Sequence, residues 1–399
     1  MTYGEVKQFL DRHTNVVELT DGQGARVAVC PEFVGRVMTS TCDGATCDGA
    51  TCDGSDGPSF GFVNRTFIET GNLDPKFNNY GGEERMWLSP EGGQFSLWFE
   101  EGEEQTWDNW VTPAALNRGA WQVESAEDRL CRMTTAATLQ NASGTPFEVD
   151  VAREVRLVDE AGFRELFGPA AADFLAGGVT MVGYETVNQI TNRGPSMTPE
   201  KGLLSIWILG QMMSSPQTVV VVPYRPGPED SLGPVVKADY FGQVPSDRLK
   251  ILPEAVLFRA DSRYRSKIGT SQRRARDVLG SIDFAAGVLT LVKFTMPDDP
   301  AQERYVNNMW ETPLDEPYVG DVINSYNDGP ASPEEAGFGE FYEIESLSPA
   351  KILGSGQSLE HRHRTFHIRA DEETLAALAK EIFGVEWQAV RDAMFTESD

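Results

Sequence analysis

Long stretches in which apolar and other residues alternate constrain the fold of this chain more than any other feature. In the segment 146–157, Phe147, Val149, Val151, Val155 and Leu157 all fall on one side of an extended chain. Similar patterns occupy residues 178–190, 218–223 and 288–294. A period of two residues is that of a β-strand with one buried face, whereas a helix needs a period of 3.6. These segments therefore predict long β-strands.

Few segments have the periodicity of a helix. We expect one helix near residues 3–12, one near 160–174, and a C-terminal helical tail at about 371–396 that is broken at Gly384. Asp371 is a suitable N-cap for the tail. Gly, Pro, Asn and Asp separate the strands, and no regular alternation of strand and helix occurs. This pattern predicts an all-β sandwich with peripheral helices. Because no Pro- or Ser-rich linker divides the chain, residues 1–399 are predicted to form a single domain.

Composition excludes some classes of partner. The 399 residues are 40% hydrophobic and 10% aromatic, and the formal net charge is −27. Such acidity argues against nucleic acid or an anionic membrane surface as a partner. No apolar run approaches the roughly 20 residues of a membrane span, and no signal peptide is visible at the N-terminus, so we expect a cytoplasmic protein. Five cysteines do not suggest a disulfide framework.

Three of the four histidines lie within seven residues, in the segment 358–368. An extended chain places His361, His363 and His367 on one face. Just upstream, Glu343 and Glu345 also share one face. Imidazoles and carboxylates are suited to proton transfer or metal ligation, so His361, His363, Glu343 and Glu345 are the candidate catalytic residues. The alternative is that these histidines are structural hydrogen-bonding groups.

No metal or other cofactor is expected. The His-x-His pattern of residues 361–363 is typical of cupin metal sites, but the rest of the cupin pattern is missing. The repeated Thr-Cys-Asp-Gly-Ala motif spaces Cys42, Cys47 and Cys52 five residues apart. This spacing is wider than in most zinc knuckles, so we interpret the repeat as a duplication in a surface loop rather than as a metal or redox site.

A cluster of charged and aromatic residues lies between two Gly-Gly turns. If this stretch is extended, Glu83, Arg85 and Trp87 share a face, with Glu91 nearby. Carboxylates and guanidinium groups bind sugar hydroxyls, and an aromatic ring packs against the C–H surface of a sugar. A solvated turn is the alternative interpretation. Four other tryptophans are assigned to the core, and they are Trp98, Trp107, Trp110 and Trp207.

The segment 259–276 is the one basic region, with seven Lys or Arg residues against a single acid, Asp261. It favours an anionic sugar, such as a uronate, a sulfated sugar or a sugar phosphate, with Arg265 and Lys267 as the expected contacts. The alternative is a solvated loop that pairs with the acidic surface.

Four short motifs, taken in order, resemble the galactose mutarotase-like superfamily, which includes the aldose 1-epimerases. They are Asn64-Arg65, Tyr80-Gly-Gly, the segment 190–193 ending at Arg193, and Glu343-Ile-Glu345. The resemblance extends over about residues 30–370 and implies a β-supersandwich that binds a sugar on a concave sheet face. Relatives carry histidines where this chain has Tyr80 and Arg193, so the resemblance does not supply the usual acid.

The sequence therefore favours an enzyme that acts at or near the anomeric centre of a small carbohydrate. Glu343 or Glu345 is expected to be the base, and His361 or His363 the acid. The residues expected to hold the sugar are Asn64, Arg65, Tyr80, Glu83, Arg85, Trp87, Glu91, Arg193, Arg265 and Lys267. The alternatives are a non-catalytic sugar-binding protein and a lyase or hydrolase of anionic polysaccharide. Neither the identity of the sugar nor the oligomeric state is indicated.

Overall fold

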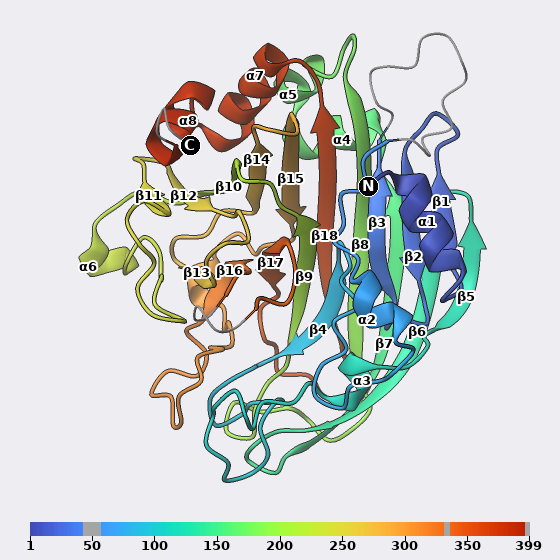
Figure 1. Ribbon diagram of the computed structural model, residues 1–399. Helices are drawn as coiled ribbons and strands as arrows, with labels where there is room; N and C mark the ends of the chain where they lie inside the picture. Colours follow the sequence, from blue (N-terminus) through green and yellow to red (C-terminus); the bar gives the residue numbers. More distant parts are fainter. Residues whose placement is uncertain (43–56, 331–335, 396–399) are drawn as a thin grey trace.

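The computed structural model describes residues 1–42, 57–330 and 336–395, which fold mainly into antiparallel β-sheets (Figure 1). The strands are β1 Val17–Thr20, β2 Arg26–Cys30, β3 Arg36–Thr41, β4 Arg85–Ser89, β5 Gln122–Glu127, β6 Leu130–Gln140, β7 Pro146–Leu157, β8 Thr180–Asn192, β9 Ser205–Met213, β10 Thr218–Pro223, β11 Leu249–Ile251, β12 Ala255–Arg259, β13 Ser266–Ser271, β14 Val278–Asp283, β15 Val288–Phe294, β16 Asp321–Asn327, β17 Phe341–Leu347 and β18 Ser358–Arg369. The prediction of an all-β chain is confirmed.

Within the described residues, the strands form three sheets. Ten strands make the largest sheet, in the order β11-β12-β10-β14-β15-β18-β8-β7-β6-β5. A second sheet has five strands in the order β13-β16-β17-β9-β4, and β1, β2 and β3 form a small third sheet. Figure 1 shows the five-stranded sheet in front of the ten-stranded one. Strands β17 and β18 are neighbours in sequence but belong to different sheets, and this separation decides where their side chains point.

The alternating segments form strands close to their predicted bounds. Strands β7, β10 and β15 begin and end as predicted, and β8 is shifted by two residues. The apolar face of β7 is buried, as Phe147, Val149, Val151 and Val155 show, while the residues between them are more exposed. Burial of this face is what stabilises the strand against the rest of the sandwich.

The helices lie at the periphery. They are α1 Tyr3–Asp11, α2 Arg65–Glu69, α3 Ala114–Asn117, α4 Glu160–Phe167, α5 Pro169–Asp173, α6 Glu229–Leu232, α7 Glu372–Phe383 and α8 Trp387–Met394, with a 3₁₀ turn at Pro300–Gln302. Asp371 caps α7 as predicted, and Gly384 ends that helix in the left-handed conformation. The single helix expected at 160–174 is instead two helices, because Gly168 has a φ of 89° and is followed by Pro169.

Separate apolar clusters lie on the two faces of the ten-stranded sheet. One cluster occupies the space between this sheet and the five-stranded sheet and also includes Trp87, Trp110 and Trp207 on the other side of the five-stranded sheet. Another joins the outer face of the ten-stranded sheet to α4, α5, α7 and α8. The remaining face of the five-stranded sheet is covered by loops rather than by helices, and the candidate site lies there. No helix in the described ranges is both long enough and apolar enough to cross a membrane.

Candidate functional site

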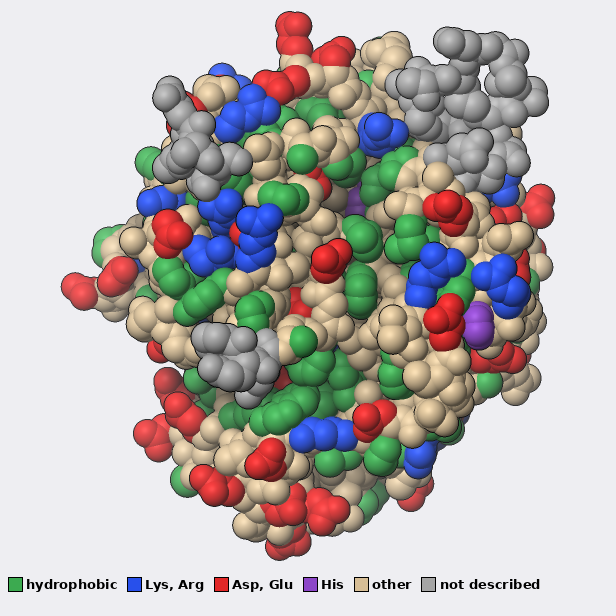
Figure 2. Space-filling view, viewed as in Figure 1, with side chains coloured by type: hydrophobic (Ala, Val, Ile, Leu, Met, Phe, Trp, Pro, Cys, Tyr) green, Lys and Arg blue, Asp and Glu red, His purple; other side chains and the backbone are tan. Residues whose placement is uncertain are grey.

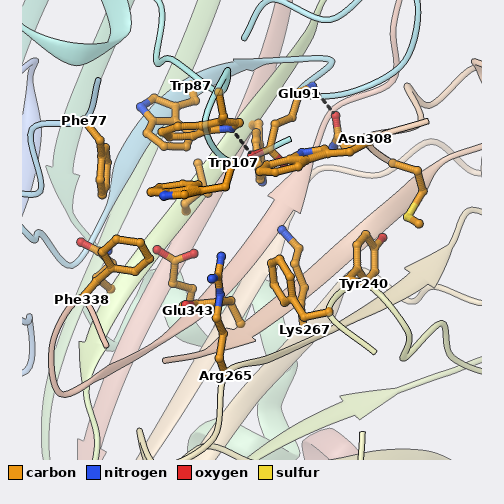
Figure 3. Close-up of a pocket in the computed structure, with 18 of the residues that line it drawn as sticks. Phe77, Trp87, Glu91, Trp107, Tyr240, Arg265, Lys267, Asn308, Phe338 and Glu343 are labelled. Carbon is orange, nitrogen blue, oxygen red and sulfur yellow. Dashed lines mark hydrogen bonds between the residues drawn. The ribbon is translucent and has the colours of Figure 1, made fainter. Parts of the chain in front are cut away.

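A cavity of about 530 Å³ lies on the face of the five-stranded sheet that points away from the ten-stranded sheet. Alternate residues of β4, β9, β13, β16 and β17 form its floor, and the loops near Trp107, Tyr240, Trp310 and Phe338 form its walls. Figure 2 shows hydrophobic side chains gathered around a hollow on this face, and Figure 3 shows the side chains that line it. The volume is within the usual range for small-molecule sites.

The walls of the cavity are largely aromatic. Five tryptophans line it, together with Phe77, Tyr240, Phe241, Tyr326, Phe338 and Phe341; the tryptophans are Trp87, Trp107, Trp110, Trp207 and Trp310. Trp107 stacks on Trp110 with ring centroids 5.2 Å apart, and 39% of Trp107 is exposed. The assignment of Trp107 to the core is therefore wrong, whereas Trp110 and Trp207 are buried as expected and also border the cavity. Trp98 is buried as expected.

Glu343 and Arg85 form an ion pair in the floor. Glu343 is on β17 and Arg85 on β4, the two strands that flank β9. Their Oε1 and Nη2 atoms are 2.9 Å apart, and both side chains are almost fully buried. The Arg85 guanidinium also lies 4.4 Å from the centre of the Trp87 ring. The expected shared face of Arg85 and Trp87 is confirmed.

A second ion pair lies directly beside the first. Lys267 Nζ is 3.1 Å from Glu345 Oε2, and Trp207 Nε1 donates a hydrogen bond of 2.9 Å to the same oxygen. Burial raises the pKa of Glu345 to about 7, although Lys267 opposes this shift. Burial would lower the pKa of Lys267, but attraction to Glu345 and to other cavity carboxylates outweighs it and raises that pKa. Lys267 lines the cavity, and Glu345 lies behind it.

The Glu91 carboxyl group is held by a hydrogen bond, whereas Glu343 and Glu345 are in ion pairs. Its backbone N–H donates to Asn308 Oδ1 at 2.8 Å (Figure 3). Its Oε1 accepts a hydrogen bond of 2.9 Å from Trp110 Nε1. Burial raises the pKa of Glu91, while Lys267 and the Trp110 hydrogen bond oppose the shift. A carboxyl group with a raised pKa retains its proton at higher pH and can act as an acid.

The structure thus brings together six of the predicted site residues in one cavity. They are Arg85, Trp87, Glu91, Arg265, Lys267 and Glu343. These residues come from three stretches that are distant in sequence, residues 85–91, 265–267 and 343. Their convergence supports the interpretation of this face as a binding site.

The histidines are not part of this cavity. Ser346 Oγ lies 2.8 Å from His361 Nε2 and 2.9 Å from His363 Nδ1, so both imidazoles are bound in the space between the two large sheets. Ser346 follows Glu345 on β17 and therefore faces the opposite side of the sheet. Burial lowers the pKa of His361 to about 3. The expected convergence of these imidazoles with Glu343 and Glu345 on one site is wrong, because β18 belongs to the ten-stranded sheet.

Glu83 also points between the sheets. Its Oε1 is 3.0 Å from His367 Nε2 and accepts a hydrogen bond of 2.7 Å from Ser40 Oγ. The chain bends at Glu83, and β4 begins only at Arg85. The bend interrupts the alternation, so the expectation that Glu83 shares a face with Arg85 and Trp87 is wrong.

Asn64 and Arg65 lie at the start of α2, away from the cavity. The Asn64 side chain caps this helix by accepting a hydrogen bond of 3.1 Å from the backbone N–H of Phe67. The Arg65 guanidinium lies 4.5 Å from the ring centre of Phe9 in α1. Neither residue lines the cavity, so the structure gives them local roles in place of the expected sugar contacts.

Tyr80 and Arg193 are also outside the cavity. Tyr80 stacks on Phe33 with ring centroids 4.3 Å apart, in the apolar cluster beneath α1. Arg193 is exposed and pairs with Asp150, which accepts a 2.5 Å hydrogen bond from Arg193 Nε. The two positions that the motif resemblance matched to histidines therefore do not contribute to this cavity.

Several cavity residues could not be selected from the sequence. They are Phe77, Asp239, Tyr240, Phe241, Asn308, Trp310, Glu311 and Phe338, most of which lie in loops. The one available signal was the presence of aromatic residues in irregular, polar segments such as 103–110 and 307–311. Exposed aromatic residues in loops are more often found at binding sites than at random surface positions.

No group of three or more His, Cys, Asp or Glu side chains in residues 1–42, 57–330 and 336–395 is placed to hold a metal ion. Most of the Thr-Cys-Asp-Gly-Ala repeat, including Cys47 and Cys52, lies outside the described residues.

Comparison with known families assigns the chain. Residues 1–394 match a model described as "Family of unknown function (DUF6786)". The chain belongs to this family. A comparison of this DUF6786 member with curated proteins finds no match.

Solved structures with similar folds were also found. A galactose mutarotase-like protein from Lactobacillus casei ATCC 334 has a TM-score of 0.47 and 10% identity, over 88% of this chain and 100% of that one. An Escherichia coli K12 protein provisionally named an aldose 1-epimerase has a TM-score of 0.48 and 14% identity, over 89% and 99%. A galactose mutarotase related enzyme from Lactobacillus acidophilus has a TM-score of 0.43 and 8% identity, over 88% and 97%. The similarity predicted from the motifs is thus found, but at these TM-scores it carries no argument about activity.

Proposed function

We propose that this protein binds a small carbohydrate in the aromatic cavity and interconverts its anomers, with Glu343 as base and Glu91 as acid. The observation that carries the proposal is the presence of two carboxyl groups in contrasting environments on one cavity. Glu343 is paired with Arg85, whereas burial raises the pKa of Glu91. Two titratable groups whose environments differ in this way are the arrangement that acid–base catalysis requires.

The cavity suits a sugar in shape and in chemistry. Aromatic rings such as Trp87 and Trp107 offer flat apolar surfaces for the C–H faces of a pyranose, and their edges leave room for hydroxyl groups. Charged groups of the floor, including Lys267 and Arg85, can bind hydroxyl oxygens. A volume of about 530 Å³ admits a monosaccharide or disaccharide.

The reaction needs one proton to be removed and another to be donated. The Glu343 carboxylate accepts the proton of the anomeric hydroxyl while Glu91 donates its proton to the ring oxygen, and the bond between C1 and that oxygen breaks. The open-chain aldehyde rotates about the C1–C2 bond. The ring oxygen then attacks the other face of C1, Glu91 recovers its proton, and Glu343 returns its proton to the new anomeric hydroxyl. The ion pair with Arg85 holds the Glu343 carboxylate in position as the base.

The proposal retains the predicted glutamate base and replaces the histidine acid. His361 and His363 are hydrogen-bonded to Ser346 on the other side of the five-stranded sheet, so they cannot reach a sugar in the cavity. Glu91 was expected only to bind the sugar, yet its hydrogen bond from Trp110 fixes its carboxyl group at the cavity wall.

The test is anomer interconversion followed by NMR on freshly dissolved galactose, glucose and mannose and on their uronic acids. Wild-type protein should accelerate interconversion of at least one of them above the buffer rate. Glu343→Gln and Glu91→Gln should each lower that rate by about 100-fold or more, since general acid or base catalysis contributes 10²–10⁴-fold. Glu316→Gln is the matched control, because Glu316 is exposed and outside the cavity. No acceleration of any sugar by wild-type protein refutes the catalytic proposal.

A non-catalytic sugar-binding protein is the second candidate. It is favoured by the fact that Glu343 and Glu345 are both held in buried ion pairs, which suits binding as well as catalysis. Calorimetry on the same sugars separates the two candidates. Binding without acceleration would identify a sugar-binding protein, whereas acceleration that depends on Glu343 and Glu91 would identify the enzyme.

A further inference from the structure

Arg265 differs from the other cations of the cavity because it has no acidic partner among the described residues. Arg85 pairs with Glu343, and Lys267 pairs with Glu345. No carboxylate oxygen in the described ranges lies within 4.0 Å of a guanidinium nitrogen of Arg265. The buried Nε of Arg265 has no hydrogen-bond acceptor. A buried guanidinium N–H without an acceptor is costly unless a ligand or water supplies one.

Aromatic rings hold this guanidinium in place. Its Cζ atom lies 4.5 Å from the ring centre of Phe241, 5.8 Å from that of Phe338 and 5.9 Å from that of Trp107. These rings come from three separate loops. Figure 3 shows the Arg265 guanidinium directed into the cavity between Glu343 and Lys267. Such contacts position an arginine without satisfying its hydrogen bonds, so its N–H groups remain available to a ligand.

The acidic groups nearby leave this positive charge largely uncompensated. Glu343 and Glu345 are already paired, and burial raises the pKa of Glu91, which favours its neutral form. Asp239 and Glu311 also line the cavity, but both are exposed and their charges are screened by solvent. Because the chain as a whole carries −27, its general field disfavours anions, so any preference for an anionic ligand must come from a local group.

We infer that the bound sugar carries an anionic substituent, a carboxylate or a sulfate ester, and that Arg265 binds it. This inference rests on the proposed function. A planar guanidinium can donate two parallel hydrogen bonds to either group, which fixes the orientation of the sugar ring as well as its affinity. Arg265 is then the residue that determines specificity for acidic over neutral sugars.

The experiment compares matched ligands that differ only in charge. Calorimetry would measure binding of methyl glucuronide and methyl galacturonide, their uncharged carboxamides, the parent methyl glucoside and methyl galactoside, and the 6-sulfates of those parents. Methyl glycosides cannot open their rings, so this measurement is independent of catalysis. Wild-type protein should bind at least one acidic glycoside about tenfold tighter than its uncharged partner, which corresponds to about 1.4 kcal/mol. The uronide and sulfate series identify which anion is recognised.

Variants then assign the preference to Arg265. In Arg265→Gln the ratio of acidic to neutral affinity should fall to about one, and Arg265→Lys should retain part of it, because lysine keeps the charge but not the two parallel donors. Arg263→Gln is the matched control, since Arg263 is exposed and outside the cavity. Circular dichroism and the thermal midpoint establish that each variant is folded. An unchanged ratio in Arg265→Gln overturns the inference.

The outcomes also separate this inference from the proposed function. If wild-type protein binds neutral glycosides as tightly as acidic ones, the role of Arg265 is refuted while sugar binding stands. If no glycoside is bound at all, sugar binding itself fails and the inference fails with it.

Discussion

Replacing Lys267 by methionine tests how the buried charges of the floor are balanced. The replacement removes the ammonium group 3.1 Å from Glu345 and keeps an unbranched chain against Trp207 and Tyr240. Glu345 is then left with the hydrogen bond from Trp207 as its one side-chain polar contact among the described residues. Removing one partner of a buried ion pair costs roughly 3–5 kcal/mol when the other partner stays ionised.

Protonation of Glu345 limits this cost and makes it depend on pH. In the wild-type fold the pKa of Glu345 is about 7, above its ordinary value of 4.5, so the folded state binds its proton more tightly than the unfolded state. Stability therefore decreases as the pH rises from about 4.5 to 7 in both proteins. Above pH 7 wild-type Glu345 is ionised and the dependence ends. In the variant the pKa rises further, so the variant continues to lose about 1.4 kcal/mol per pH unit.

The expected result is a difference in the free energy of unfolding that is nearly constant below pH 7. The difference between wild type and variant should grow by about 3 kcal/mol between pH 7 and pH 9, because each of the two pH units contributes about 1.36 kcal/mol. Urea unfolding at pH 6, 7.5 and 9, followed by both tryptophan fluorescence and circular dichroism, measures this difference, and coincident transitions justify a two-state treatment.

Lys293→Met is the matched control. Lys293 pairs with Asp277 at 2.8 Å, but both side chains are partly exposed. Its replacement should cost less than 1 kcal/mol at every pH. A Lys267→Met difference that stays the same at pH 6 and pH 9, or that grows toward low pH, would refute the assignment of a buried, pKa-shifted Glu345.

Two further predictions concern residues that the structure removes from the site. Burial lowers the pKa of His361 to about 3, below its ordinary value of 6.5, so the unfolded state binds that proton first and stability falls as the pH drops from about 6.5 toward 3. His361→Gln should therefore reduce the slope of the unfolding free energy against pH, between pH 6 and pH 4, by up to about 1.4 kcal/mol per pH unit. Sugar binding should be unchanged. If the slope is also unchanged, His361 is protonated in the folded state and the assignment of a lowered pKa is refuted. Asn64→Ala removes the cap of α2 and should lower stability by about 1 kcal/mol without altering sugar affinity, and a tenfold loss of affinity by calorimetry would place Asn64 at the sugar after all.

The sequence was most informative where the physics is local. Alternation of apolar residues in β7 and β15 predicted strands with their observed bounds, because a strand places neighbouring side chains on opposite faces whatever surrounds it. For the same reason the shared face of Arg85 and Trp87, and that of Glu343 and Glu345, followed from spacing. The N-cap at Asp371 was equally local, since a cap depends on groups three residues away.

Tertiary structure decided which of these faces meet. The pattern of β18 places His361 and His363 on one face, but it does not predict that their hydrogen-bond partner is Ser346 rather than Glu345. That choice depends on β18 pairing with β8 and β15 in one sheet while β17 pairs with β9 and β16 in another.

The cavity walls were decided in the same way. Trp107, Phe241 and Phe338 meet around Arg265 although more than 90 residues separate each of these rings from the next along the chain. Local periodicity carries no information on contacts between such distant loops, because they arise only when the sheets pack. The sequence alone therefore determined the strands, the caps and which side chains share a face, whereas the packing of the sheets decided that carboxylates, arginines and tryptophans, and not histidines, form the candidate site.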